Sequence, residues 1–421
     1  GLEEPPYLPI IEKDPGFLEL FEEALERGKV ITGHGCGLGG RELQAYRLMG
    51  AASDHECTTG VEAREKARVG QSISMREGSG ASDVVNVCRA VTELGVDPRC
   101  FTFCGDEVEF LRLYKLGHLD YNLRLAVAAG VGPVRAVQMA TINAAQLLGV
   151  DREMGSIAPG KLADLVLVED LQQFKVRTVL VGGRPVVENG EFVAELKRPR
   201  YPRHMYRTVR LKRPLRLEDF AIPAPPGARR ARVRVIGVTD GSLISDRREA
   251  WLEVRDGEVR ADPGQDVLKI AMVDRYGRWD RVGLGFIQGF NLKRGAIGST
   301  YNPLYENIVT VGADDRDLLA ASRAIASMGG GFVAVDGGEV VGKLALPLFG
   351  LLSDETLEAA AAQMEQVYAG VREMGCKLKK GPFHTLAFMC ACGEIGHLKI
   401  CHEGLFDVEQ RRVVDTVLEW E

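Results

Sequence analysis

Long apolar runs are missing from this 421-residue chain, which has no stretch approaching the ~18–20 residues that cross a bilayer. No signal-peptide pattern opens it. A large charge of one sign is also missing: the formal net charge of −6 gives no general attraction to nucleic acid or to an anionic membrane. The nine cysteines are odd in number and lack the spacing of a disulfide scaffold, which indicates reduced thiols. We therefore expect a cytoplasmic protein that binds neither nucleic acid nor a membrane.

Histidine is scarce, with 7 residues in 421. His34 lies in "ITGHGCGLGG" (31–40) and His55 in "ASDHECT" (52–58), and each comes just after a strand-like run. One interpretation is a metal centre at the carboxyl ends of barrel strands, where active sites of α/β proteins lie. The other is a pair of loop histidines with no special role.

The order of the patterns indicates more than one domain, as the length suggests. Residues 1–145 alternate short β runs with amphipathic helical runs, which predicts a parallel sheet with helical crossovers. Residues 154–192 are β-rich and carry Gly-Gly and Asn-Gly turn signals. A basic, Pro-rich stretch then resembles a linker, and the remainder mixes β runs with two amphipathic helices at 315–329 and 354–375.

Several blocks resemble the adenine deaminase family of the amidohydrolase superfamily, in order from about residue 1 to 409. They include "GHGCGLGGRELQAY", "SDHECTT", "MREGSGASD", "GFIQGFNLKRGAIGST" and "MGGGFVAVDGGEV". The resemblance implies an α/β fold whose first domain is the later part of a metal-dependent (β/α)8 barrel. The implied domains are the barrel part at 1–150, a β-sandwich segment at 151–195, the linker at 196–230 and an α+β domain of the adenine deaminase type at 231–421.

The resemblance also implies a metal site. His34 and His55 match ligands that follow barrel strands five and six, and Asp106 matches the strand-eight aspartate that binds metal and shuttles a proton. Glu4 matches the glutamate that bridges two metals, with Glu3 adjacent and the register between them open. Imidazole together with carboxylate suits Mn, Fe or Zn, so we expect two divalent ions that make hydroxide available at neutral pH.

Further residues match the family near these ligands. Glu77 is expected to be catalytic, since a carboxylate can shuttle protons, with an ordinary surface ion pair as the alternative. His118 and Asp120 are expected to be structural. The residues expected to bind substrate are Arg76, Ser79 and Glu107.

The sequence departs from the family pattern in three places. The strand-one His-x-His pair and the first three strand–helix units are not in this chain, which begins at Gly1. We expect an N-terminal region outside this numbering, or a partner chain, to supply them, and we expect a homo-oligomer. Gly105 stands where the family has a hydroxyl residue, and the loop "TYNPLYENI" (300–308) has no histidine.

The function implied is hydrolytic deamination of adenine, or of a related purine, to hypoxanthine and ammonia. The departures leave two alternatives: a cyclic-amide or other heterocycle hydrolase with a changed pocket, or a non-catalytic homologue or subunit. A second cluster could hold a soft metal, but we favour simple packing for it. Its residues are Cys390, Cys392, His397, Cys401 and His402.

Overall fold

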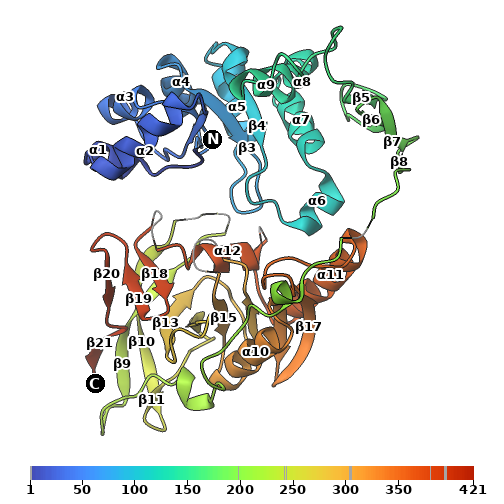
Figure 1. Cartoon of the computed structure of the whole chain (residues 1–421). Helices are drawn as coiled ribbons and strands as arrows, with labels where there is room; N and C mark the ends of the chain where they lie inside the picture. Colours follow the sequence, from blue (N-terminus) through green and yellow to red (C-terminus); the bar gives the residue numbers. More distant parts are fainter. Residues whose placement is uncertain are drawn as a thin grey trace. The chain divides into compact units, whose positions relative to one another are not determined.

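The computed structural model describes residues 2–197, 199–240, 242, 244–302, 306–379, 381–392 and 396–421. The chain forms two compact units, Gly1–Arg198 and Pro199–Glu421. Figure 1 colours them from blue through green, and from green to red, respectively. No helix in the described residues is both long enough and apolar enough to cross a membrane.

The first unit begins with alternating helices and strands. Its helices up to the last parallel strand are α1 (Tyr7–Ile11), α2 (Pro15–Glu26), α3 (Gly40–Leu48), α4 (Gly60–Arg68), α5 (Val84–Thr92) and the 3-10 turn η1 (Pro98–Cys100). The strands are β1 (Ile31–Gly33), β2 (Ala51–Asp54), β3 (Ser72–Arg76) and β4 (Phe101–Cys104). Four more helices follow, α6 (Phe110–Leu116), α7 (Leu119–Ala128), α8 (Pro133–Ala140) and α9 (Ile142–Leu147).

The four strands form one parallel sheet in the order β1-β2-β3-β4. The first residues of the chain run parallel to its edge, because Leu2 bridges Ile31 and Pro6 bridges His34. The sheet is not closed into a barrel within the described residues. What the structure has is an α/β domain with a helix between each pair of consecutive strands (Figure 1).

Local chemistry explains the helices that cross between strands. The Thr59 hydroxyl caps α4 by accepting a hydrogen bond from the Glu62 backbone at 3.2 Å. The apolar face of α5 is buried against the sheet, where Val87 and Cys88 pack with Ile73. These contacts fix each helix on the sheet, and the loops that follow the strands are held at one edge.

The first unit ends in a second, antiparallel sheet, drawn in green in Figure 1. Its strands are β5 (Leu165–Val168), β6 (Val176–Val181), β7 (Arg184–Glu188) and β8 (Glu191–Phe192). The Gly182–Gly183 and Asn189–Gly190 pairs both take positive φ at the two hairpin turns, as tight hairpins require.

The second unit is built on a mixed sheet in the order β11-β10-β9-β13-β12-β15-β14-β16-β17, with β21 beside β9. Its strands are β9 (Arg230–Gly237), β10 (Asp246–Arg255), β11 (Glu258–Val259), β12 (Val267–Val273), β13 (Val282–Gln288), β14 (Ala296–Ser299), β15 (Ile308–Gly312), β16 (Gly331–Asp336), β17 (Glu339–Ala345) and β21 (Val417–Trp420). A small sheet adds β18 (Leu398–Cys401), β19 (Gly404–Asp407) and β20 (Arg412–Val414).

Helices cover this sheet. Those of the second unit are α10 (Asp315–Ser327), α11 (Leu357–Glu373), α12 (Pro382–Phe388), η2 (Arg203–Tyr206) and η3 (Leu217–Phe220). Helices α10 and α11 correspond to the two amphipathic patterns and pack on β14–β17. Leu215 and Phe220, in the stretch that resembles a linker, are buried in the core beside α10. This part of the stretch therefore packs as part of the second unit.

Candidate metal centre

The polar side chains of interest follow the parallel strands at the edge where those strands end. His34 comes directly after β1, His55 directly after β2, and Arg76 is the last residue of β3. Asp106 lies two residues beyond β4 and has a positive φ of 54°. Because parallel strands end at the same edge of a sheet, residues distant in sequence meet there.

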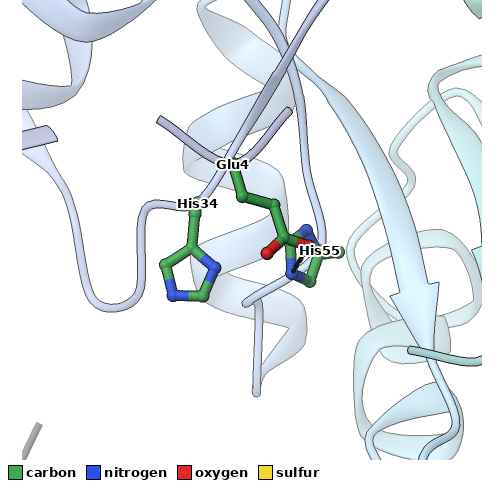
Figure 2. Close-up of side chains that lie close together, drawn as sticks. All are labelled: Glu4, His34 and His55. Carbon is green, nitrogen blue, oxygen red and sulfur yellow. Dashed lines mark ion pairs between the residues drawn. The ribbon is translucent and has the colours of Figure 1, made fainter. Parts of the chain in front are cut away.

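Glu4, His34 and His55 form the first group of possible ligands. One ligand atom from each lies within 4.8 Å of those of the other two. The two imidazole rings are 5.2 Å apart between centroids, and Glu4 Oε1 is 3.4 Å from His55 Nε2. Figure 2 shows the Glu4 carboxylate beside the His55 ring. Glu4, rather than the adjacent Glu3, is the glutamate in this group.

His55, Glu56 and Asp106 form a second group that shares His55 with the first. His55 Nε2 lies 3.5 Å from Glu56 Oε1 and 4.0 Å from Asp106 Oδ2. Glu56 was not anticipated from the sequence, although it stands next to His55 in "DHE". A carboxylate adjacent to a candidate ligand was the signal that could have identified it.

Arg76 joins the carboxylates of the second group. Its guanidinium donates to Glu56 and, at 2.9 Å, to Asp106 Oδ2. Arg76 and Glu56 are both buried, so neither charge is well screened by water. The arginine predicted to bind substrate thus holds two carboxylates in place.

The pKa values of Asp106 and Glu107 shift in opposite directions. Burial opposes ionisation of Asp106, but hydrogen bonds from Glu107 and Arg76 outweigh it, and the pKa of Asp106 falls below its usual value. Burial and the charge of Asp106 raise the pKa of Glu107 to about 8. Glu107 also accepts from the backbone of Gly80 and Ala81 at 3.1 and 3.0 Å. The pair therefore combines an ionised and a protonated carboxyl near neutral pH.

Glu77 and Ser79 lie outside both groups of ligand atoms. The Glu77 carboxylate is buried and ion-paired with Arg112. The Ser79 hydroxyl accepts a 2.8 Å hydrogen bond from the Glu109 backbone. Both residues connect the segment after β3 to the segment after β4.

The surroundings of Gly105 explain the absence of a hydroxyl residue there. A Cβ at this position would lie 2.5 Å from His118 Nε2 and 2.8 Å from a methyl group of Val108. His118 precedes α7, and its backbone N–H donates to Asp120 at 2.8 Å. Asp120 also pairs with Arg124 one turn later.

The second cluster of the sequence does not gather its ligands. Cys390, Cys392 and Cys401 are buried, whereas His397 pairs with Glu409 at 2.9 Å. His402 stacks on Trp279 with ring centroids 4.9 Å apart. Residues 393–395 lie outside the described residues, and so do residues 303–305 of the "TYNPLYENI" loop. In the described residues, these five side chains form no group of three ligand atoms within 4.8 Å.

The thiols of this second cluster interact with one another. Cys392 Sγ donates to the Ile400 carbonyl at 3.5 Å, and the interaction with the Cys392 thiol lowers the pKa of the Cys401 thiol to about 7 and raises that of Cys392. All nine cysteines of the chain are free.

Comparison with known proteins first defines the class. The sequence model of the amidohydrolase family matches residues 6–186, and that of the adenine deaminase C-terminal domain matches residues 242–412. Members of the amidohydrolase family generally use divalent metals.

Curated relatives then define the family. A protein named adenine deaminase from Desulforamulus reducens is 35% identical over 405 residues, covering 96% of this chain and 68% of that protein. Another, from Desulfatibacillum aliphaticivorans, is 38% identical over 399 residues, with 95% and 68% covered. A third, from Moorella thermoacetica, is 35% identical over 409 residues, with 97% and 68% covered. The chain belongs to the adenine deaminase family.

Solved structures align only in part. A β-aspartyl dipeptidase from Fervidobacterium islandicum AW-1 aligns with a TM-score of 0.35 and 17% identity, covering 43% of this chain and 54% of that one. A zinc-bound adenosine deaminase from Xanthomonas campestris gives a TM-score of 0.32 and 17% identity, covering 43% and 51%. Alignment at this level carries no inference about activity.

Proposed function

We propose that this chain hydrolyses adenine to hypoxanthine and ammonia at a divalent metal centre held by Glu4, His34, His55 and Asp106. The observation that carries the proposal is the convergence of two imidazoles and two carboxylates, from four separate segments, within a family whose curated relatives are named adenine deaminase.

The donor set supports the metal. Imidazole nitrogen and carboxylate oxygen together suit Mn, Fe or Zn, and the described residues at this edge need no thiolate to complete a group of three. The proposal of two ions rests on the family resemblance, because the two groups of ligand atoms share His55 and one ring nitrogen binds a single ion. A divalent metal bound there supplies Lewis-acid polarisation and makes water a stronger nucleophile near neutral pH.

The fold supports a barrel site. We propose that β1–β4 are later strands of a (β/α)8 barrel, since active-site residues of such barrels lie at the carboxyl ends of the strands. The expectation that a His-x-His pair completes the ligand set stays a prediction.

We propose separate roles in the reaction for Asp106, Arg76 and Glu107. Water adds to the amino-bearing carbon of adenine, the C–N bond breaks, and a proton must reach the leaving nitrogen. Asp106 is the group we propose to accept the proton from water and return it to the amine. Arg76 holds Asp106 ionised and oriented, and Glu107 supplies a protonated carboxyl beside it.

Glu77 and Ser79 receive a supporting role in this account. Glu77 neutralises Arg112, and Ser79 holds the Glu109 backbone, so both stabilise the segments that carry Asp106 and Glu107. Contact with the purine is left to Glu107, because Arg76 is buried and engaged with Glu56 and Asp106.

The test is turnover of adenine by the purified chain loaded with Mn²⁺ or Zn²⁺, with hypoxanthine and ammonia both measured. We expect equal amounts of the two products, and loss of both in His55→Ala. The matched control is His204→Ala, an exposed histidine of η2 in the second unit. Turnover of a cyclic amide instead of adenine would favour a heterocycle hydrolase with a changed pocket. Turnover of neither, by the chain assembled with the segment that supplies His-x-His, would favour a non-catalytic homologue.

A further inference from the structure

We propose that the side chains of Asp54 and Lys66, both buried, and of the partly exposed Glu62 form a positioning cluster that holds the His34 and His55 loops in ligand geometry before any metal binds. This inference rests on the proposed function, because it concerns the same metal centre. None of the three residues is among the candidate ligands.

Asp54 connects the two loops through a single carboxylate. It is the last residue of β2 and is 1% exposed. Its Oδ2 accepts a 2.6 Å hydrogen bond from the backbone of Gly35, and its Oδ1 accepts one of 2.8 Å from the backbone of Glu56. Gly35 follows His34 and Glu56 follows His55, so one side chain fixes the residue after each histidine.

Lys66 completes this clamp from α4. Its ammonium donates to the Gly35 carbonyl at 2.6 Å, to Asp54 Oδ1 at 3.0 Å and to Glu62 Oε1 at 2.9 Å. All three N–H bonds are used, and the side chain is fully buried. The Gly35 backbone N–H donates to Asp54 and the Gly35 carbonyl accepts from Lys66, so both backbone polar groups of Gly35 are held.

Glu62 extends the same contacts to residues farther along both loops. Its Oε1 accepts from the Gly37 backbone at 3.1 Å, and its Oε2 accepts from the Thr58 backbone at 3.1 Å. Gly35 itself fits only because it lacks a side chain: a Cβ there would lie 2.9 Å from Asp54 Oδ2.

The energetics favour a geometric role over a purely stabilising one. Burying the Lys66 ammonium and the Asp54 carboxylate carries a large desolvation cost, so such a pair is weak support for stability and is better explained by the geometry it specifies. Its hydrogen bonds go mainly to loop backbone rather than to other elements. Partners that orient metal ligands from outside the coordination shell typically change metal affinity by about 10–100-fold when removed.

The experiment measures Co²⁺ binding to the chelator-treated full chain, using the visible absorption spectrum of the bound ion as a reporter of ligand geometry. Lys66→Met keeps the length of the side chain and removes the charge. We expect Co²⁺ affinity to fall about 10–100-fold and the visible band to change position or intensity, with cooperative unfolding retained. The matched control is Lys175→Met, which removes an exposed lysine paired with Glu169 and should leave both readouts unchanged.

A milder variant covers the case in which Lys66→Met does not fold. Glu62→Gln keeps the shape and leaves the Asp54–Lys66 pair intact, so it should fold and weaken Co²⁺ binding several-fold, with a changed band. Wild-type affinity and spectrum in a folded Lys66→Met, or in Glu62→Gln where Lys66→Met is unfolded, would overturn the positioning role.

His55→Ala separates this inference from the proposed function. Loss of Co²⁺ in His55→Ala together with unchanged binding in Lys66→Met would overturn the positioning role alone. Unchanged Co²⁺ binding in His55→Ala would overturn both, since the ion would then be bound elsewhere.

Discussion

Two regions of this chain concentrate side chains that could bind a metal, and they have different outcomes. At the edge of the β1–β4 sheet, Glu4, His34, His55 and Asp106 converge from four segments. In the stretch from Cys390 to His402, the thiols are buried. His397 pairs with Glu409, and His402 stacks on Trp279. The second region has its residues closer in sequence, yet among the described residues only the first brings imidazole and carboxylate ligand atoms together in groups of three.

In this chain the topology of a parallel sheet brings ligand residues together, whereas short spacing in the sequence does not. Parallel strands deliver their following residues to one edge whatever the sequence distance between them. In the C-terminal stretch only Cys401 of the five residues lies in β18, while His397 pairs with Glu409 and His402 stacks on Trp279.

The largest expected effect comes from removing the ligand shared by both groups. His55→Ala should lose metal and reduce adenine turnover by more than about 100-fold, because a ligand contributes more than the outer partners whose loss costs about 10–100-fold. His402→Ala should keep both. Bound metal and adenine turnover are measured for both purified variants. Equal values for the two would contradict the assignment of the metal centre to the first region.

Arg76→Met tests the charge balance of the first region. It leaves the buried Glu56 carboxylate, and the more exposed Asp106 carboxylate, without their shared cation, so the free energy of unfolding should fall by about 3–5 kcal/mol. Urea denaturation measures the change. Arg99→Met, which removes a fully exposed partner of Asp97, should be indistinguishable from wild type. A stable Arg76→Met protein would show that water or a counter-ion already balances these carboxylates.

Gly105→Thr tests the packing behind Asp106. The added side chain meets His118, so stability should fall by about 1–3 kcal/mol in thermal unfolding. The double variant Gly105→Thr/His118→Ala removes the obstructing ring and should recover part of the loss. Equal stability of the single variant and wild type would contradict the close contact described above.

The smallest expected effect is a pH dependence. Burial raises the pKa of Asp83 to about 6, despite the opposing charge of Arg76. The pKa of Asp83 is higher in the folded protein than in the unfolded chain, so protonation of Asp83 stabilises the fold. This contribution to the free energy of unfolding is fully present below about pH 4 and is lost as the pH rises through 6. Asp83→Asn should therefore become more stable relative to wild type between pH 4 and 7, as measured by urea midpoints. Asp97→Asn, at an exposed carboxylate whose pKa is lowered, should show no such trend in this range.

The sequence predicted the parts that depend on pattern. The alternation of β runs and helices located β1–β4, and the family resemblance selected His34, His55 and Asp106. It did not predict the Asp54–Lys66 pair, because a lysine on a charged amphipathic helix normally points to solvent and nothing local marks this one as buried. The burial of Leu215 and Phe220 was not predicted for a similar reason. Their neighbours in the sequence are basic and Pro-rich, which is typical of a linker, although both residues pack on α10.

The most direct test is anomalous diffraction from crystals of this chain grown with Zn²⁺, recorded on both sides of the zinc absorption edge. The account predicts anomalous density between the side chains of Glu4, His34 and His55, extending toward Asp106. Density at the Cys390–Cys401 thiols alone, with none beside His55, would contradict it.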